Sequence, residues 1–148
     1  ILIHNKRLAC CKHKRIFLNL VIPFGNAENC NAEILADLLE LEDMSSEWAE
    51  DGERAVALFA QCEEGHFDAI LMDMRMPEMD GLEATKAIRA MDREDAKKIP
   101  IIALTANAFD EDVQRSLQAG MNAHLTKPVE SEHLFRTLGE LIYEAETQ

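Results

Sequence analysis

The chain has 148 residues, enough for one domain of ordinary size with a buried hydrophobic core. Its 28 acidic side chains outnumber its 15 Lys and Arg, and five of these bases fall in the first fifteen residues, so the remainder sets 28 acids against ten bases. This charge argues against nucleic acid as a direct partner, because binding to phosphates needs a cationic surface, and it favours cationic partners.

The four cysteines have no framework spacing, and two of them are adjacent, which is typical of reduced thiols in a cytosolic protein. Cys10, Cys11 and His13 offer metal-ligating side chains, but no second pair completes a site. The longest apolar stretch, 16–24, is interrupted by an asparagine and a proline and is far shorter than the ~20 residues that span a bilayer. A basic segment before an apolar one also resembles a secretion signal, but the polar interruption favours a first strand.

Residues 1–15 show no periodic pattern, and we interpret them as a basic linker, a cloning remnant or the end of something longer. Residues 16–22 then predict a buried strand. Asn29 or Asn31 can cap a helix that ends near Glu42. The predicted apolar face of this helix consists of Ile34, Leu35, Leu38, Leu39 and Leu41.

A second short strand, 47–50, is predicted around Trp48. The next helix places apolar side chains at positions i, i+3, i+4 and i+7 and ends before Gly65. These side chains are Ala55, Leu58, Phe59 and Cys62. Residues 69–72 are all apolar, as in a strand buried on both faces of a parallel sheet, and Asp73 ends this run.

A proline and an Asp-Gly pair follow Asp73 and predict a loop. A helix is then predicted over 82–91. Its inward residues are Leu82, Thr85 and Ile88. Residues 92–98 form a charged connector in this interpretation, and the fourth predicted strand, 101–104, ends in Thr105.

The last part of the chain predicts a helix, a short strand and a final helix. The first helix carries a stripe of Phe109, Val113 and Leu117. Gly120 stops this helix in the way that a left-handed cap residue does, and the strand at 124–125 precedes Lys127. The final helix has one apolar side made of Leu134, Leu138, Leu141 and Ile142.

Five strands thus alternate with five helices along the chain. This order predicts an α/β fold in which a doubly wound parallel sheet is covered by helices on both faces. We expect residues 16–148 to form this single domain, since no internal repeat and no second domain is apparent in the sequence.

Three of the predicted strands end in a polar side chain: Asp73, Thr105 and Lys127. Because the carboxyl ends of parallel strands meet at one rim, we expect these side chains to lie together. The carboxylate can attack a phosphorus centre while the hydroxyl and the ammonium stabilise the transferred group. A carboxylate and a phosphoryl group repel each other, so we expect Mg²⁺ with oxygen ligands to bridge them.

The sequence resembles the receiver domain of two-component response regulators over residues 29–142. The resemblance rests on D-M-R-M-P-E-M-D-G at 73–81, A-L-T-A-N-A at 103–108 and A-G-M-N-A-H-L-T-K-P-V at 119–129. The residue sequences of the last two motifs are most similar to those of receivers attached to hybrid sensor histidine kinases. The family also allows a cis bond before Pro128, a conformation accessible mainly to X-Pro bonds.

The resemblance implies a five-stranded flavodoxin-like receiver fold and a role for each motif residue. Asp73 would accept phosphate from a kinase phosphohistidine, and Thr105 and Lys127 would contact the phosphoryl oxygens. The backbone carbonyl of Arg75 would join Asp73 in binding Mg²⁺. Thr105 and His124 would form the switch, with His124 at a position that usually holds an aromatic ring.

The sequence departs from the family at the acidic pair that normally follows the first strand and holds Mg²⁺. In one alignment the pair falls on Asn26 and Ala27, and in the other it falls on Phe24 and Gly25. Neither alignment supplies two acids. The nearest carboxylate is Glu28, and Glu28 or Asn26 would make a weaker cage for a hard cation.

The resemblance also implies a sensor histidine kinase or a phosphotransfer protein as partner, and a cytoplasmic location with tethering to a membrane kinase in a full-length hybrid. It allows a homodimer through the face made by the fourth helix, the fifth strand and the fifth helix. We expect no membrane insertion by this chain and, as chemistry of its own, at most self-catalysed phosphoryl transfer and slow autodephosphorylation.

Two other functions are compatible with parts of the pattern. The missing acidic pair favours a receiver that is not phosphorylated and acts as an interaction module. A phosphatase of the haloacid-dehalogenase kind also uses an Asp at a strand end. That family carries a D-x-D motif at the nucleophile, whereas in this sequence the residue two positions after Asp73 is Arg75, which offers no general acid.

Overall fold

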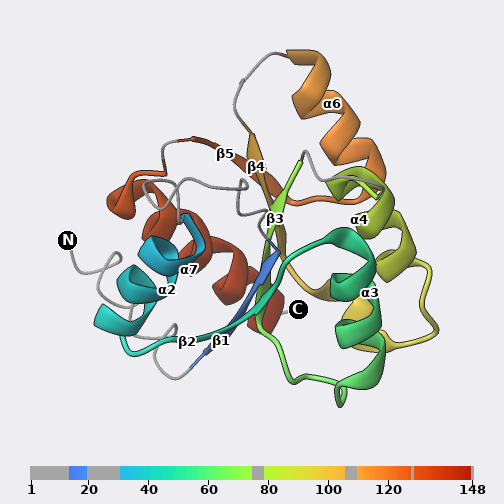
Figure 1. Cartoon of the computed structure of the whole chain (residues 1–148), viewed down its shortest axis with the longest axis horizontal. Coiled ribbons are helices and arrows are strands. Elements are labelled where there is room, and N and C mark those ends of the chain that lie inside the picture. The colour runs from blue at the N-terminus through green and yellow to red at the C-terminus, as the bar shows by residue number, and fades with distance from the viewer. Residues whose placement is uncertain (1–13, 20–30, 75–78, 106–109, 128, 148) are drawn as a thin grey trace.

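The computed structural model describes residues 14–19, 31–74, 79–105, 110–127 and 129–147 (Figure 1). Five parallel strands form one sheet in the order β2-β1-β3-β4-β5. The strands are β1 (Arg15–Asn19), β2 (Ser45–Ala49), β3 (Ala69–Asp73), β4 (Ile101–Thr105) and β5 (Ala123–Thr126). The helices are α2 (Asn31–Leu41), α3 (Gly52–Gln61), α4 (Gly81–Arg89), α5 (Glu94–Lys98), α6 (Asp110–Ala119) and α7 (Ser131–Thr147).

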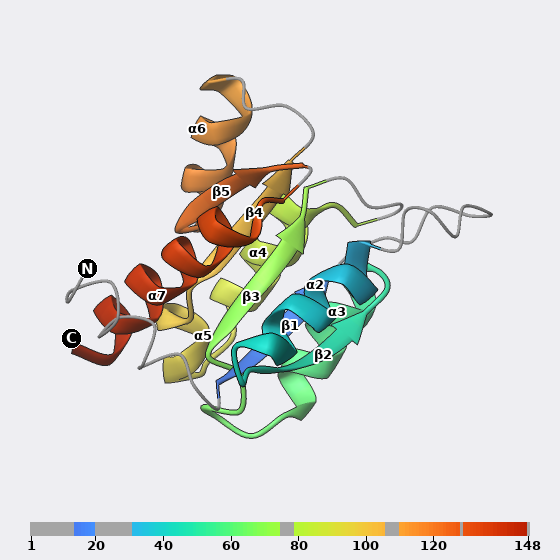
Figure 2. The same cartoon turned by 90° about the vertical axis from the view of Figure 1, so that its left-hand side faces the viewer.

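Helices cover both faces of the sheet, which confirms the predicted doubly wound α/β fold. Helices α2 and α7 lie on one face, α3, α4 and α5 lie on the other, and α6 packs beside α4 (Figures 1 and 2). Neither these helices nor any other helix in the described ranges is long and apolar enough to cross a lipid bilayer.

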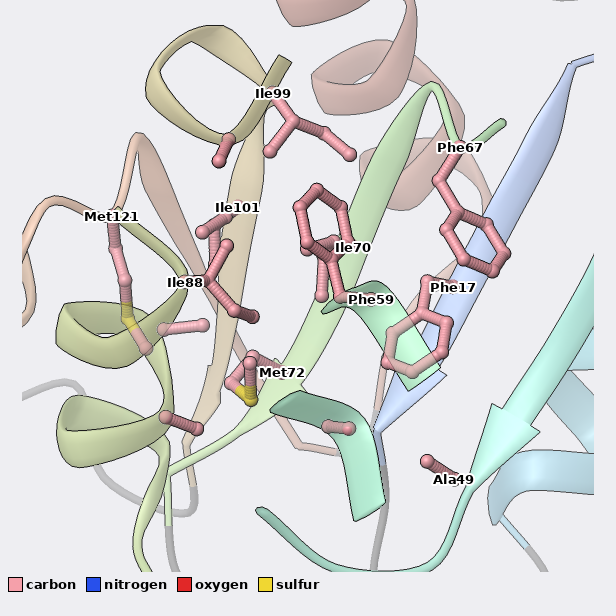
Figure 3. Packing of buried hydrophobic residues seen from close by; sticks show 14 residues of the cluster. Phe17, Ala49, Phe59, Phe67, Ile70, Met72, Ile88, Ile99, Ile101 and Met121 are labelled. Carbon is pink, nitrogen blue, oxygen red and sulfur yellow. The ribbon is translucent and has the colours of Figure 1, made fainter. Parts of the chain in front are cut away.

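Successive side chains of each central strand point to opposite faces, so the sheet separates two hydrophobic cores. Leu71 of β3 belongs to the core under α2 and α7, whereas its neighbours Ile70 and Met72 belong to the core under α3 and α4 (Figure 3). All five residues of β3 are buried. The continuous apolar run 69–72 is therefore a strand enclosed on both sides, as the sequence predicts.

Gly120 follows α6 directly with φ +107°, as predicted. The stop predicted at Gly65 is not where α3 ends: the helix ends at Gln61, its C-cap is Cys62, and Gly65 with φ +78° lies farther along the turn. The connector 92–98 was predicted wrongly in part, since it contains the short helix α5. The strand predicted over 16–22 is observed as Arg15–Asn19, and residues 20–22 lie outside the described part.

Some apolar side chains that periodicity assigns to the core are exposed. Their exposed fractions are 54% for Ile34, 78% for Leu41, 42% for Leu58 and 55% for Leu117. The buried residues of α2 are Leu35 and Leu39, a narrower stripe than the sequence predicts. Helices α2, α3 and α6 thus carry apolar surface that the described part of the domain leaves exposed.

Candidate functional site

Asp73 is the last residue of the central strand β3 and is only 5% exposed. Its backbone is paired in register with Leu104 of β4, and the amide of the next residue, Met74, donates to the Leu104 carbonyl oxygen at 3.0 Å. The strand on the other side, β1, pairs with β3 up to Met72. The carboxylate therefore stands on a backbone that is held from both sides, at the carboxyl edge of the sheet.

Lys127 reaches this carboxylate from β5, two strands away. Its Nζ lies 2.9 Å from Asp73 Oδ2, and the side chains are 28% and 7% exposed respectively. The Lys127 amide donates to the Thr105 carbonyl oxygen at 2.8 Å, which extends the ladder between β4 and β5 by one residue. A largely buried carboxylate needs a compensating cation, and this ammonium supplies it.

Thr105 ends β4 directly after Leu104, the residue that faces Asp73 in the register. It is 7% exposed. The adjacent strands β3 and β4 thus place Thr105 next to Asp73 at the same edge, and the backbone bond to Lys127 joins it to the third member. The described geometry brings Asp73, Thr105 and Lys127 to one rim.

His124 lies on β5, the strand that Lys127 directly follows. It pairs in register with Ala103 of β4 and is half-buried. Thr105 and His124 line the same small hollow between the sheet and α6, together with Met74 and Ser116. The two residues that the sequence analysis assigns to a switch therefore line one closely packed space that is too small for a water molecule.

A family model described as the response regulator receiver domain matches residues 27–139. The chain belongs to this family. Curated relatives include the sensor protein GacS of Pseudomonas syringae pv. syringae, 45% identical over 96 residues, and Histidine kinase 3 of Arabidopsis thaliana, 32% identical over 141 residues. These alignments cover 64% and 83% of this chain but 10% and 13% of the relatives. The chain thus spans only about a tenth of the length of these kinases.

Solved receiver structures have the same fold. The receiver domain of sensor histidine kinase PA1611 from Pseudomonas aeruginosa, which holds a magnesium ion in its active site cleft, is 37% identical with a TM-score of 0.75. The alignment covers 88% of this chain and 98% of that one. The receiver domain of Ssk1 from Saccharomyces cerevisiae, crystallised with the histidine phosphotransfer protein Ypd1, is 26% identical with a TM-score of 0.71, and the alignment covers 88% and 89%.

The receiver domain holds the backbone after Asp73 against the start of α4. The Gly81 amide donates to the Met74 carbonyl oxygen at 3.2 Å, and the buried Thr85 hydroxyl donates to the Gly81 carbonyl oxygen at 2.7 Å. Asp80 caps the helix by accepting from the Glu83 amide at 2.8 Å. The Asp-Gly pair, which predicts a loop from the sequence, therefore also holds the start of α4 against the end of β3.

Two residues of the hollow were missed in the sequence analysis. Met74 follows Asp73, and Ser116 is buried on α6 with its hydroxyl donating to the Val113 carbonyl oxygen at 2.7 Å. Ser116 lies at helical spacing from Val113, and an inward-facing polar residue on a helix striped with apolar ones was the available signal.

Only some of the residues predicted to bind a divalent cation lie in the described part of the chain. The described ranges contain no group of three or more His, Cys, Asp or Glu side chains placed to hold a metal, so Asp73 is the carboxylate that this rim offers there. The other predicted ligands, the Arg75 carbonyl, Asn26 and Glu28, lie outside the described residues, as does Pro128.

Proposed function

We propose that this receiver domain takes a phosphoryl group onto Asp73 from the phosphohistidine of a sensor kinase or phosphotransfer protein. The contact between Lys127 Nζ and the Asp73 carboxylate at 2.9 Å is the observation that carries the proposal. It gives the carboxylate a cation that can stay in contact with the oxygens of an incoming phosphoryl group, on a rim where Thr105 adds a hydroxyl.

In the proposed reaction a carboxylate oxygen of Asp73 attacks the phosphorus. The new bond is O–P, the bond that breaks is the P–N bond to the partner's imidazole, and the electron pair of that bond returns to the imidazole nitrogen, which is neutral or takes up a proton. Lys127 and Thr105 orient the phosphoryl oxygens and stabilise their charge.

We propose Mg²⁺ as the cofactor, held by Asp73, the Arg75 carbonyl and an oxygen of Glu28 or Asn26. When bound, the cation would supply positive charge that offsets the repulsion between a carboxylate and a phosphoryl group. Only one carboxylate, Glu28, occurs between the end of β1 and the start of α2, so we expect a lower affinity than a cage with two further acids would give.

The switch proposal follows from the hollow shared by Thr105 and His124. When the Thr105 hydroxyl turns toward a phosphoryl group, it vacates space on the His124 side, and the His124 ring can move inward. This movement changes the surface made by α6, β5 and α7, which is also the surface we propose for a homodimer.

The whole protein is proposed to be a hybrid histidine kinase or a regulator that works with one, in the cytoplasm. The curated kinases support this proposal because their match to the chain is confined to a segment of each, and the complex of the Ssk1 receiver with Ypd1 supports a phosphotransfer protein as donor or acceptor.

The test is intact-mass analysis after incubation with acetyl phosphate and Mg²⁺. We expect one phosphoryl group on the native domain and none on Asp73→Asn. Lys127→Ala should slow phosphorylation by about thirtyfold or more, because a transition-state contact of this type is worth about 2–4 kcal/mol. The matched controls are Asp92→Asn and Lys98→Ala, which alter exposed side chains of α4–α5 and should leave the rate unchanged.

A second candidate, the interaction module that is not phosphorylated, is favoured by the absence of the acidic pair from the sequence. It requires that the folded native domain stay unmodified at millimolar Mg²⁺ and that Asp73→Asn bind a partner as well as the native domain does. Phosphorylation at Asp73 excludes this candidate, and steady hydrolysis of p-nitrophenyl phosphate would instead support a phosphatase.

A further inference from the structure

A cavity of about 350 Å³ lies between α3 and the edge strand β2, on the side of the molecule away from Asp73. Its residues come from β1, β2, α3 and the segment before β3, whereas Asp73 stands at the opposite end of β3. The size falls within the range of about 300–1,000 Å³ that is common for ligand sites. We call it the α3–β2 groove.

The floor of the groove is aromatic and its two sides are exposed. Phe17 and Phe67 pack with ring centroids 4.7 Å apart at 64° and are both buried, and Figure 3 shows them side by side next to β1. Trp48 on β2 and Leu58 on α3 line the same cavity, and each is 42% exposed. A large apolar side chain that entered between Trp48 and Leu58 would therefore cover apolar surface that the described domain leaves in water.

The charged groups on the groove are linked to one another. The carboxylate of Glu47 lies 2.7 Å from His66 Nε2, and Arg15 Nη1 lies 2.9 Å from His66 Nδ1. The His66 ring also packs edge-on against Phe67, with centroids 4.6 Å apart. Glu47 is thus an exposed anion held at the rim, with Arg15 on the far side of the histidine ring.

The segment 45–65, which supplies most of the groove, is acidic, and two cations from other segments lie beside it: Arg15 contacts His66, and Arg93 donates to the Cys62 carbonyl oxygen at 2.9 Å. Residues 45–65 contain six acids and a single base, Arg54, whose guanidinium lies 2.6 Å from the Glu50 carboxylate. The acids are Glu47, Glu50, Asp51, Glu53, Glu63 and Glu64. They extend along β2 and α3 beyond the cavity itself, so a ligand that matched them all would be longer than a small molecule.

From this juxtaposition we propose that the α3–β2 groove docks a basic segment of a partner protein. One large apolar side chain of that segment fills the space between Trp48 and Leu58, and Lys or Arg residues beside it meet Glu47 and the neighbouring acids. The groove lies away from the phosphoacceptor, so it holds a partner while leaving Asp73 accessible, and docking does not depend on phosphorylation.

Trp48 is the single tryptophan of the chain, so its fluorescence reports on the groove directly. The probe is a short amphipathic peptide made of Leu and Lys, compared with the same peptide carrying Glu in place of Lys. We expect the Leu/Lys peptide to shift the Trp48 emission in a saturable way, and the Leu/Glu peptide to leave it unchanged.

Variants decide whether the peptide sits in the groove. Leu58→Ser and Glu47→Gln should each weaken peptide binding by about fivefold or more, since an interface anchor typically contributes over 1 kcal/mol. The matched controls, Leu41→Ser and Glu40→Gln, remove an exposed leucine and an exposed acid from α2 and should not change the affinity. Thermal melts verify that every variant is folded.

Equal losses in the groove variants and the α2 controls would mean non-specific attraction to an acidic protein and would overturn the proposal. So would an unchanged Trp48 emission, or a small apolar amine that binds the groove as tightly as the peptide. The Asp73→Asn variant should bind the peptide as the native domain does, so failure of docking and failure of phosphorylation are observed separately.

Discussion

Gly81 has no room for a side chain because α4 begins directly against the end of β3. An ideal Cβ at this position would lie 2.3 Å from the Asp73 carbonyl oxygen and 3.1 Å from Met74 Cα. Both obstacles are backbone atoms, so a shift of a flexible side chain cannot relieve the overlap. The close packing that only a glycine permits at position 81 therefore helps to hold the backbone of Asp73 in place.

We expect Gly81→Ala to destabilise the domain by about 1–3 kcal/mol, the usual effect of overpacking, and to slow phosphorylation by moving the backbone of Asp73. Chemical denaturation and the acetyl phosphate assay measure the two effects. Gly65→Ala is the comparison: nothing lies within 4 Å of its added Cβ, but φ is +78°, so stability should fall by about 1 kcal/mol with no change in phosphorylation rate. A normal rate in Gly81→Ala would contradict this view of the loop.

At the level of elements, Arg89 joins α4 to α5 and to the turn between α6 and β5. Its guanidinium donates to the Gly120 carbonyl at 2.9 and 3.0 Å, to the Ala96 carbonyl at 2.9 Å and to Asn122 Oδ1 at 2.9 Å. Burial lowers the pKa of Arg89 from its ordinary value. These acceptors offset the loss of hydration and fix three segments around one side chain.

We expect Arg89→Ala to lower the free energy of unfolding by about 2–4 kcal/mol, because it leaves several partly buried acceptors without their charged donor. Arg89→Lys should recover less than half of this loss, since an ammonium cannot reproduce the planar fork. Urea denaturation measures both variants. Lys86→Ala, an exposed change on the same helix, should stay within about 0.5 kcal/mol of the native domain.

Strand β3 was predicted from the sequence and helix α5 was not, and the difference has a physical reason. Strand β3 and its terminal Asp73 could be predicted because a run of apolar residues ending in an acid is a local pattern. Helix α5 could not, since it contains one buried residue, Ala96, and is preceded by Arg93, whose guanidinium donates to the Cys62 carbonyl oxygen and lies 4.8 Å from the Phe59 ring centre. These contacts come from a distant part of the chain.

Contacts between distant parts of the chain also explain why the sequence could not predict which apolar residues are exposed or how close the site residues lie. Periodicity shows that Ile34, Leu41 and Leu58 are apolar, but not whether another element covers them. Strand ends located Asp73 and Lys127 on one rim, whereas their 2.9 Å contact depends on strand order and register, which no single stretch of sequence encodes.

At the scale of the whole molecule, the net charge of −13 opposes the folded state through self-repulsion. We expect NaCl at about 200 mM to raise the melting temperature by a few degrees relative to low salt, because exposed charges more than about 8 Å apart are then largely screened from one another. A specific Mg²⁺ site should add to this: about 10 mM MgCl₂ should stabilise the domain more than NaCl of equal ionic strength. The Asp73→Asn variant is the control and should lose the extra stabilisation. Equal effects of the two salts would argue against a magnesium site.

The central position of β3 has an evolutionary consequence. Its neighbours on both sides are strands, and its two faces are covered by different sets of helices, so in the described part of the domain β3 contributes almost nothing to the surface except at Asp73. Mutations that redesign the outside of α2, α3 or α6 can therefore accumulate, and partners can be exchanged, while the position of the Asp73 carboxylate stays the same.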